Sequence, residues 1–406
     1  MTILQINEVL NGSTGSIMRE ITSKAEQLGN KVYIAYGYGN SKDLKAYRIG
    51  AIWEKKIHAL IFTRILGLHG FGSILSTYKF LKWIDIIKPN VIHIHNLHTN
   101  YINFPLLYKY IIRKKIPVVM TLHDCYNFTG QCEHYSGIGC NKYKTGCGNC
   151  PSLHHTIAPS WIFDWSYWLL KKKKQWYEQI DNMTIVAVSK WLKKDSSESI
   201  LNSPQHNITY IYNWIDTNIF YPRSEEEQLN IRRKYGLNEK MKYILTVGAG
   251  WNKNTTKFQD AIRLSEQLPS DYQLILVGKL TKGTVLPNNI KHIDFTNNPS
   301  ELAAIYTLAE AYVHLSVCDT FGKVIAEAMA CGTLPMVFDS TACPEIVGKL
   351  GVVVKPHYVE GFIEAINTHF NEKINPQELI MYVKKNYNKN SNIQKYIDIY
   401  NSIKQN

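Results

Sequence analysis

Residues 311–338 have the sequence AYVHLSVCDTFGKVIAEAMACGTLPMVF, and this stretch decides the fold. Ala311–Leu315 and Leu334–Phe338 are short apolar runs without clean alternation, which is typical of strands buried on both faces. Between them lies Val324–Ala330, which has the pattern of a helix. A strand, a helix and a second strand in this order predict a parallel sheet with helices on both of its faces.

Strand and helix patterns alternate in the same way along most of the chain. Further strand patterns are Thr2–Ile6, Val32–Ala35, Val91–His95, Val118–Leu122, Thr184–Val188, Tyr243–Val247, Gln273–Val277, Lys291–Phe295 and Val352–Val354. Further helix patterns are Ile17–Leu28, Thr77–Ile87, Ala261–Leu268 and Ser300–Leu308. Because these strands are too many for one comfortable sheet, we expect two α/β domains, each with a doubly wound parallel sheet.

A break in composition near the middle of the chain marks the boundary between the two domains. The segment Asn213–Tyr235 is polar, carries Pro222 and contains the acidic run Glu225–Glu227, and we interpret it as the connection. The N-terminal domain is therefore predicted at residues 1–212, with a cysteine-rich loop at 125–150.

The C-terminal domain is predicted at residues 213–385 and is followed by a C-terminal helix at 386–406. We expect this helix to pack back on the N-terminal domain. Ligands of open α/β sheets bind at the carboxyl ends of the strands. We therefore expect a site in a central cleft that the two domains face.

The composition excludes several classes of protein. Of 406 residues, 45% are hydrophobic and 19% are charged, which suits packed cores rather than a disordered chain. Eight cysteines are too few for a disulfide-rich secreted framework. The first residues lack a signal-peptide pattern, and no uncharged apolar run reaches the roughly 18–20 residues of a spanning helix, so we expect a cytoplasmic protein. The net charge of +13 predicts an anionic partner, which could be phosphates, a nucleic acid or an acidic membrane surface.

Two groups of residues follow strands of the first domain. Gly12 and Gly15 lie between the first strand and its helix, where backbone N–H groups could approach an anion, although this motif alone favours an ordinary tight turn. His93 and His95 end a later strand, where His93 suits a core position and His95 could be either core or functional. His123 and Asp124 follow the next strand, and His123 is the functional candidate there, with a general-base role suggested by the neighbouring carboxylate.

A cluster of cysteines lies in the first domain. Cys132, Cys140, Cys147 and Cys150 fall within 19 residues, and Cys125 lies just upstream. Four thiolates in a glycine-rich loop are typical of a structural zinc site, which would order the loop and leave no open coordination position for catalysis. Free thiols or a disulfide pair are the alternatives.

An aromatic and basic stretch follows the cysteines. Trp161–Leu170 carries three tryptophans and leads directly into Lys171–Lys174. This adjacency favours an element that lies on an anionic bilayer, with aromatic rings in the interface and lysines on the headgroups. The apolar segment Ile57–Leu75 could be a second such element, and packing of the aromatics in a core is the alternative.

The second domain holds the strongest constellation. Gly248 follows a strand, and Lys253 and Lys257 come shortly after it, an arrangement that suits a diphosphate. Asp319 and Glu327 lie eight residues apart, one before a helix and one inside it, so the two carboxylates could bind polyol hydroxyls at separate points. Thr320, Phe321 and Gly322 fall at the helix start, where backbone N–H groups are available.

At this point the chain resembles the retaining glycosyltransferases of family 4 (GT4), which have the two-domain architecture called GT-B. The hallmark of that family is a segment like E-x-F-G-x-x-x-x-E-A-M-A-x-G, and residues 319–332 match it with Asp319 in place of the first Glu. The segment Asp124–Gly130 and the cysteines downstream resemble the subgroup that builds bacterial exopolysaccharide, capsule or O-antigen. The resemblance covers essentially the whole chain.

The resemblance implies a role for each matching residue. Glu327 would hold the ribose hydroxyls of a nucleotide-sugar donor, and Asp319, with the backbone of Phe321 and Gly322, would hold the donor sugar. Gly12 and Gly15 would approach the donor phosphate or the acceptor, and His123 would lie beside the transferring sugar. The family commonly has an Arg after the glycine of the second domain, whereas this chain has Ala249 and Gly250. Lys253 and Lys257 are the nearby cations left for the diphosphate.

The expected activity is therefore that of a hexosyltransferase-type glycosyltransferase (EC 2.4) without a catalytic metal. It would move a sugar from a nucleotide-sugar to a saccharide acceptor linked to polyprenyl diphosphate, at the inner face of the cytoplasmic membrane. With no carboxylate of the first domain in a nucleophile's position, we expect same-face attack, with the leaving phosphate taking the acceptor's proton.

Two classes of alternative remain open. One is a transferase with a soluble acceptor, or a nucleotide-sugar epimerase of the same fold. The other is a basic zinc-bearing nucleic-acid-binding protein. The lysines do not gather on one recognition helix, which argues against this alternative, so we expect no nucleic-acid partner.

Overall fold

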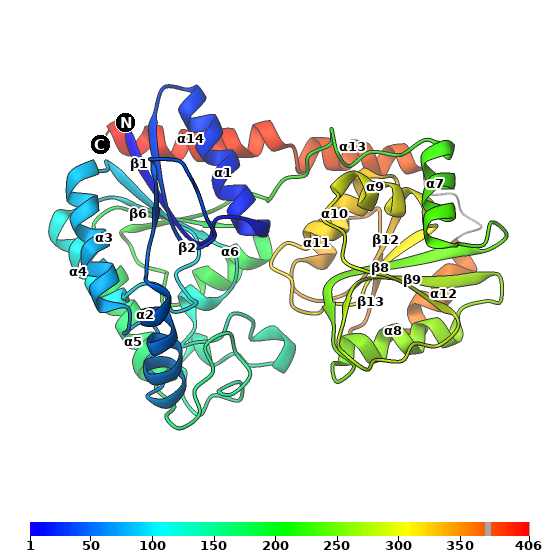
Figure 1. The fold of residues 1–406 in the computed structure, drawn as a ribbon, viewed down its shortest axis with the longest axis horizontal. Helices are drawn as coiled ribbons and strands as arrows, with labels where there is room; N and C mark the ends of the chain where they lie inside the picture. The colour runs from blue at the N-terminus through cyan, green and yellow to red at the C-terminus, as the bar shows by residue number, and fades with distance from the viewer. Residues whose placement is uncertain (370–374, 406) are drawn as a thin grey trace. The chain divides into compact units, whose positions relative to one another are not determined.

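The computed structural model describes residues 1–369 and 375–405. The chain divides into two compact units, which we call unit 1 (Met1–Ile211 with Asn390–Asn406) and unit 2 (Tyr212–Lys389). In Figure 1, unit 1 runs from blue to green and includes the red helix α14, and unit 2 runs from green to orange. The chain therefore passes from unit 1 into unit 2 and returns at its end.

Unit 1 contains a seven-stranded parallel sheet with the strand order β3-β2-β1-β4-β5-β6-β7. Its central strands β4, β5 and β6 are buried along their whole lengths, which explains why their sequences are mostly apolar and do not alternate. The strands are β1 (Thr2–Val9), β2 (Lys31–Tyr38), β3 (Ala46–Arg48), β4 (Val91–Ile94), β5 (Val118–Leu122), β6 (Met183–Ala187) and β7 (His206–Tyr210). The edge strands β3 and β7 were missed by the sequence analysis because neither is fully buried and neither has a continuous apolar run.

The helices of unit 1 cover this sheet, and one of them comes from the far end of the chain. They are α1 (Gly12–Gln27), α2 (Ile52–Ile57), a π-helix (His58–Ile65), α3 (Ile74–Ile87), α4 (Phe104–Lys114), α5 (Ser166–Tyr177), α6 (Lys190–Ser197) and α14 (Lys389–Gln405). The cysteine-rich loop carries only three short 3₁₀ turns: Tyr126–Phe128, Ser136–Ile138 and Lys142–Lys144. On α14, the Tyr400 hydroxyl lies 2.5 Å from His93 Nδ1 on β4, so the C-terminal helix is bonded to the sheet of unit 1.

Unit 2 contains a six-stranded parallel sheet with the strand order β10-β9-β8-β11-β12-β13. Its strands are β8 (Lys242–Trp251), β9 (Tyr272–Leu280), β10 (Ile290–Ile293), β11 (Ala311–His314), β12 (Leu334–Phe338) and β13 (Val352–Val354). Its helices are α7 (Glu225–Tyr235), α8 (Thr256–Gln267), α9 (Pro299–Leu308), α10 (Lys323–Ala330), α11 (Cys343–Val347), α12 (Glu360–His369) and α13 (Pro376–Asn386). The predicted strand–helix–strand unit is thus β11-α10-β12, with β11 and β12 adjacent and parallel.

The acidic run at Glu225–Glu227 is not part of a linker, contrary to the sequence interpretation. It forms the first turn of α7, where Ser224 and Glu227 make a reciprocal capping box. Carboxylates at a helix N-terminus interact favourably with its dipole, which explains an acidic run at this position. The chain crosses between the two units earlier, at Ile211 and Tyr212.

Each sheet has a topological switch point, where the chain stops adding strands on one side and begins on the other. In unit 1 the switch point lies between β1 and β4, and in unit 2 between β8 and β11. Ligands of open α/β sheets bind beyond the carboxyl ends of the strands at such points. The residues after β1, β4, β8 and β11 are therefore the first place to look for function.

Candidate functional site

The switch point of unit 2 holds Asp319 at the end of a row of hydrogen-bonded side chains. The Tyr312 hydroxyl lies 2.7 Å from His314 Nδ1, and His314 Nε2 lies 2.8 Å from Asp319 Oδ2. Tyr312 and His314 are on β11 and are 0% and 3% exposed. The backbone N–H of Asp319 also donates to Thr341 Oγ1. This carboxylate is therefore held in one orientation by the strand that precedes it.

The surroundings of Asp319 keep it ionised. Burial acts to raise its pKa, but the His314 imidazole, the Ser316 hydroxyl and the charge of Lys257 together hold the pKa well below its usual range. Its side chain remains 29% exposed, so one face of the carboxylate is open to a ligand. A fixed, ionised and accessible carboxylate is suited to accept hydrogen bonds from hydroxyl groups.

The segment after Asp319 turns sharply into α10. Gly322 has φ +75°, and a Cβ placed on it would lie 2.6 Å from Ile325 Cδ1, so a larger residue would be strained here. Phe321 is 2% exposed and packs edge-on against Tyr387 at 5.3 Å between ring centroids, whereas Thr320 is partly exposed. The turn thus places the N-terminus of α10 directly after the carboxylate.

Glu327 lies inside α10 and has the opposite electrostatic environment. It is 7% exposed. Burial raises the pKa of its carboxyl to about 7, and the charge of Lys323 and the neighbouring Tyr306 hydroxyl only partly offset this effect. The two carboxylates predicted from the sequence are therefore both positioned at the β11–α10 connection, one fully ionised and one near its titration point at neutral pH.

Lys257 faces the same region from α8. Its Nζ lies 4.3 Å from the centroid of the Trp251 ring, and a Cβ added to Gly248 would approach Nζ to 2.8 Å. Burial lowers the pKa of Lys257, and the negative charge of Asp319 opposes this shift. Lys253 differs, since its side chain is exposed in the turn before α8.

The glycine-rich segment after Val247 is not a free loop, contrary to the sequence prediction. Strand β8 continues through it to Trp251, with an irregularity in its pairing with β9 between Val247 and Gly250. Gly248 is therefore part of the extended backbone of β8 and not part of a phosphate-binding loop. Its missing side chain is the reason that Lys257 can lie across it.

At the switch point of unit 1, His123 pairs with His95 rather than with its neighbour Asp124. His95 Nδ1 lies 3.0 Å from His123 Nε2, and the two ring planes differ by 15°, with their centroids 5.3 Å apart. His95 is fully buried and belongs to this group rather than to an apolar core. Burial lowers the pKa of His123 to about 4, so its imidazole is neutral at physiological pH.

Asp124 instead pairs with His98, which also contacts Glu8, a residue that the sequence analysis missed. His98 Nε2 lies 2.7 Å from Asp124 Oδ2, and Nδ1 lies 3.0 Å from Glu8 Oε2 in an ion pair. Burial acts to lower the pKa of His98, but the two carboxylates raise it to about 10. Burial acts to raise the pKa of Asp124, but His98 and the Tyr126 N–H lower it to about 2. Glu8 was overlooked because β1 extends to Val9, three residues beyond its predicted end.

Gly12 and Gly15 lie in the first turn of α1, which begins five residues before its predicted start. Gly12 has φ +82° and open space around it, so its backbone can be approached. A Cβ on Gly15 would lie 2.6 Å from the Leu10 carbonyl, so this glycine is required for packing of the helix against the preceding loop. The two glycines therefore differ in the role that they can play.

The four cysteines of the predicted metal site lie in one loop, and none of them forms a disulfide. Burial, and then the thiols of Cys150, Cys147 and Cys140, raise the pKa of Cys132 to about 12, so the four lie near one another. The Gly130 N–H donates to Cys147 Sγ at 3.3 Å. Among residues 1–369 and 375–405, the three-residue set whose ligand atoms lie within 4.8 Å of one another is His314, Asp319 and Cys343, and no set of these thiols reaches that spacing.

The aromatic and basic stretch divides between surface and core. Trp161 and Ile162 are 56% and 61% exposed, and Lys171 and Lys174 are exposed. Lys173 is buried, and its Nζ donates to the carbonyls of Tyr126 and Thr129, at 2.6 and 3.0 Å. The prediction that all four lysines face headgroups is therefore wrong for Lys173, which binds α5 to the start of the cysteine-rich loop. Burial lowers its pKa to about 7.

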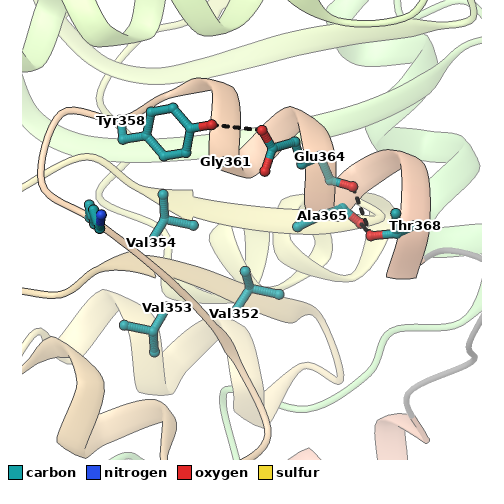
Figure 2. A pocket seen from close by; sticks show the side chains of 9 residues that line it. Val352, Val353, Val354, Tyr358, Gly361, Glu364, Ala365 and Thr368 are labelled. Atoms are coloured by element: carbon teal, nitrogen blue, oxygen red, sulfur yellow. Dashed lines mark hydrogen bonds between the residues drawn. The ribbon is translucent and has the colours of Figure 1, made fainter.

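Two surface hollows lie outside these constellations. One, of about 600 Å³, is formed by β13 and α12 in unit 2, where Tyr358 donates to Glu364 (Figure 2). It contains neither Asp319 nor Glu327. The other, of about 460 Å³, adjoins the start of α1 in unit 1 and is lined by polar side chains that include Arg19 and Glu26.

None of the helices in the described part of the chain is both long enough and apolar enough to cross a membrane.

Comparison with known proteins identifies both halves of the chain. A sequence model of Glycosyltransferase Family 4 matches residues 15–219, about half of the chain, and one of Glycosyl transferases group 1 matches residues 227–386. The Escherichia coli K12 protein named as a glycosyl transferase of colanic acid biosynthesis, WcaC, is 23% identical over 364 residues, 86% of each chain. The O-antigen chain mannosyltransferase B of Escherichia coli is 25% identical over 217 residues, 50% of this chain and 54% of the relative.

Solved structures share the fold over almost the whole chain. A glycosyltransferase from Rickettsia africae has a TM-score of 0.71 at 16% identity, covering 100% of this chain and 99% of that one. The Anabaena protein Alr3699/HepE, solved in complex with UDP-glucose, has a TM-score of 0.68 at 14% identity, covering 99% and 100%. The two parallel-sheet units thus have the GT-B architecture that the sequence predicted.

Proposed function

The chain belongs to Glycosyltransferase Family 4, and we propose that it transfers a sugar, with retention, from a nucleotide-sugar to a saccharide acceptor in the assembly of a bacterial surface polysaccharide. The observation that carries this proposal is the pair Asp319 and Glu327 at the switch point of unit 2. The colanic acid and O-antigen relatives support the polysaccharide, and the UDP-glucose complex of the Anabaena protein supports the donor class.

Different residues of unit 2 bind the ribose, the sugar and the diphosphate of the donor. Glu327 accepts hydrogen bonds from the ribose diol, and its raised pKa means that this binding favours the ionised form. Asp319, already ionised, accepts from hydroxyls of the donor sugar. Lys257 and the N-terminus of α10, which begins directly after Thr320, Phe321 and Gly322, compensate the diphosphate charge. Lys253, being exposed, reaches the diphosphate only if its side chain reorients.

The reaction breaks the bond between the sugar C1 and the diphosphate oxygen and forms one between C1 and an acceptor oxygen. Negative charge develops on the leaving diphosphate, where Lys257 and the helix N-terminus stabilise it without a catalytic metal. The acceptor approaches from the face that the diphosphate leaves, and its hydroxyl proton passes to the departing phosphate oxygen. Glu8 and Asp124 are both bound to His98, which supports this route over a covalent intermediate on a unit 1 carboxylate.

The acceptor is bound by unit 1. His123 lies at the switch point of that unit, and Gly12 offers an approachable backbone at the start of α1. The polar hollow beside α1, with Arg19, Glu26 and Asp43 in its lining, has the mixture of donors and acceptors that saccharide hydroxyls need.

We further propose that the acceptor is linked to polyprenyl diphosphate and that unit 1 docks on the anionic inner face of the cytoplasmic membrane. The docking surface consists of exposed apolar side chains from two segments, with Trp53, Leu60 and Ile61 on one and Trp161, Ile162 and Phe163 on the other. The backbone N–H of Trp161 donates to the backbone carbonyl of Arg64 at 2.7 Å, so the segments are adjacent. Lys56 is exposed on α2, which also carries Trp53, and Lys171 and Lys174 are exposed on α5, which follows Phe163 in the chain. These lysines suit acidic headgroups.

Vesicle binding tests the docking surface. The protein should co-sediment with vesicles of anionic phospholipid more than with neutral ones, and a Trp161→Ser and Ile162→Ser double variant should lose this binding. Trp176→Ser is the matched control. The Trp176 ring stacks on Tyr108 at 5.2 Å between centroids and so packs against the protein, and its loss should not change vesicle binding. Equal sedimentation of the wild type and the double variant would favour a soluble acceptor.

Cys132, Cys140, Cys147 and Cys150 are proposed to hold a structural zinc ion. Four thiols in a loop with little regular structure, one of them accepting a backbone N–H, are a donor set that Zn²⁺ prefers. Elemental analysis should find about one zinc per chain. Cys147→Ser should lose it and Cys318→Ser, outside the loop, should keep it. Absence of zinc from the purified wild type would end this proposal.

Transfer itself is tested by a thermal-shift screen of nucleotide-sugars, since a tight ligand stabilises the folded state by mass action. We expect one donor to raise the midpoint of unfolding in the wild type and not in Glu327→Gln. Radiolabelled sugar from that donor should then appear in an acceptor fraction. Conversion of the donor to another nucleotide-sugar without transfer would favour the epimerase alternative, and family membership leaves no support for the nucleic-acid-binding one.

A further inference from the structure

Unit 2 contains a buried hydroxyl without a hydrogen-bond partner. Tyr306 lies on α9 and is 0% exposed. Within residues 1–369 and 375–405, which the structure describes, its hydroxyl makes no hydrogen bond. A buried hydroxyl gives up its bonds to water when the chain folds, so an unpaired one destabilises the folded state. Tyr306 therefore needs an explanation other than stability.

The Tyr306 ring is fixed in place, and the position of its hydroxyl oxygen is fixed with it. The ring packs edge-on against Tyr312 on β11 and against Phe220, with centroids 5.7 and 6.3 Å apart. The Tyr306 carbonyl accepts from Thr333 Oγ1 at 2.7 Å, just after the end of α10. This bond holds α9 against α10, the helix that carries Glu327. The hydroxyl proton alone can still rotate about the C–O bond.

The neighbour of this hydroxyl is the Glu327 carboxyl. Burial, and then the negative charge of Glu327, hold the pKa of Tyr306 well above its usual range, so the hydroxyl keeps its proton. Burial raises the pKa of Glu327, whereas the charge of Lys323 and the Tyr306 hydroxyl lower it. Tyr312 on β11 and Cys331 on α10 also face Glu327, and burial keeps both protonated. Tyr306 is thus a neutral hydrogen-bond donor beside a carboxyl that can lose its proton.

We propose that Tyr306 is a positioning residue that donates to the ionised Glu327 carboxylate when the ribose of the nucleotide binds, and so holds this carboxylate toward the ribose diol. This inference rests on the proposed function. Binding of the diol favours the ionised carboxylate, which releases its proton to solvent and then accepts stronger hydrogen bonds than the neutral acid does. The unpaired hydroxyl gains a partner in the same step. Its cost is thus borne by the empty site and removed in the nucleotide complex.

The variants separate the hydroxyl from the ring that carries it. Tyr306→Phe keeps the packing of the ring and removes the hydroxyl. Tyr243→Phe is the matched control, because Tyr243 is also 0% exposed in unit 2 and its hydroxyl donates to the Asn238 carbonyl at 3.1 Å. Combining Tyr306→Phe with Glu327→Gln tests whether the hydroxyl acts through the carboxylate.

The unfolding midpoint without ligand tests whether the hydroxyl is unpaired in the empty site. At pH 5, where Glu327 is protonated, Tyr306→Phe should raise the midpoint because it removes an unpaired buried group. Tyr243→Phe should lower it, since the Asn238 carbonyl loses its partner. The gain in Tyr306→Phe should shrink at pH 8, where the ionised carboxylate lacks its hydrogen bond. A midpoint of Tyr306→Phe below that of the wild type at pH 5 would overturn the proposal.

The contact with the carboxylate is measured by NMR of the full chain labelled with ¹³C-glutamate. The Glu327 signal is identified by its loss in Glu327→Gln. Because a hydrogen bond to the charged form lowers a pKa, Tyr306→Phe should raise the pKa of Glu327 by about one pH unit, and Tyr243→Phe should leave it unchanged. The same pKa of Glu327 in the wild type and Tyr306→Phe would contradict the proposed contact.

Calorimetric titration with UDP at pH 8 tests the role in binding. Tyr306→Phe should weaken binding about tenfold, as expected for the loss of one hydrogen bond to a charged group, and Tyr243→Phe should bind like the wild type. In the Glu327→Gln background, Tyr306→Phe should have little further effect. An equal loss in both backgrounds would show that Tyr306 does not act through Glu327. If the wild type does not bind UDP, the proposed UDP-sugar donor fails instead, and the pKa of Glu327 still decides whether Tyr306 donates to it.

Discussion

The two switch points use their titratable groups in opposite ways. In unit 2, Asp319 is kept ionised by His314, while burial raises the pKa of Glu327 to about 7, so that this carboxyl is only partly ionised at pH 7. In unit 1, burial keeps His95 and His123 neutral, and the charges are confined to the His98 group with Asp124 and Glu8. Unit 2 therefore offers carboxylates for a ligand, and unit 1 offers neutral imidazole beside charges that already satisfy one another.

The largest effect should come from Glu327. Glu327→Ala should lower transfer by about a thousandfold or more, since it removes charged hydrogen bonds to the donor in a buried site. The folded state should persist, which circular dichroism and the unfolding midpoint will check. Wild-type turnover by this variant would remove the ribose assignment and with it the contrast between the two units.

Asp124→Asn should show that the charges of unit 1 are structural. Removing one partner of a buried ion pair should cost on the order of 3 kcal/mol of unfolding free energy, measured by urea unfolding at pH 7. Because the pKa of Asp124 is lowered to about 2, its contribution is present above its unfolded pKa and is lost as pH falls toward 2. The variant and the wild type should thus converge in acid. A constant difference down to pH 2 would show that the ion pair is not the cause.

Glu327→Gln should stabilise the folded protein, whereas Asp124→Asn should destabilise it. A carboxyl whose folded pKa is raised to about 7 loses stability as pH rises from its unfolded value through 7. At pH 8 the neutral amide should gain at most about 3 kcal/mol over the wild type. The gain should disappear at pH 4, where both forms are neutral. An unfolding free energy equal to that of the wild type at pH 8 would mean that the carboxylate is already compensated.

The smallest effect should come from His314. His314→Phe keeps an aromatic ring but removes the donor to Asp319 Oδ2, which should lower kcat/KM about tenfold, as expected for one hydrogen bond worth about 1.4 kcal/mol. Tyr312→Phe, one bond further away, should have less effect in the same assay. A greater loss in Tyr312→Phe than in His314→Phe would show that Asp319 is not held through this row.

The contrast also explains what the sequence could predict. Asp319, Gly322 and Glu327 lie within nine consecutive residues of one strand–loop–helix connection, so their arrangement follows from local structure. The parallel pairing within both sheets follows similarly from the alternation of strand and helix patterns, whereas the order of the strands is known from the structure alone. In unit 1, by contrast, Gln5, His95 and His123 meet across 90 and 28 residues, and pairing along the sheet selected His98 rather than His123 as the partner of Asp124.

Predictions from local sequence were also wrong or incomplete where the burial of a side chain or the length of a strand decided the structure. Lys173 follows two lysines in sequence but falls on the inner face of α5, and the glycines after Val247 extend a strand instead of forming a loop. Glu8 could have been found by extending the first strand to Val9, since Asn7 and Val9, on either side of it, continue the pairing with β2. Helical and strand periodicity were the available signals in each case.

Calorimetric titration with UDP tests the central claim, that Glu327 binds the donor as a carboxylate, most directly. The wild type should bind UDP more tightly at pH 8 than at pH 6, because below the pKa of about 7 binding must first remove a proton, at a cost of about tenfold in affinity per pH unit. Any effect of the titration of UDP itself is the same for the wild type and for Glu327→Gln. This variant should bind UDP more weakly than the wild type and should lack the additional pH dependence that comes from Glu327. Equal affinities of the two proteins at both pH values would contradict the account.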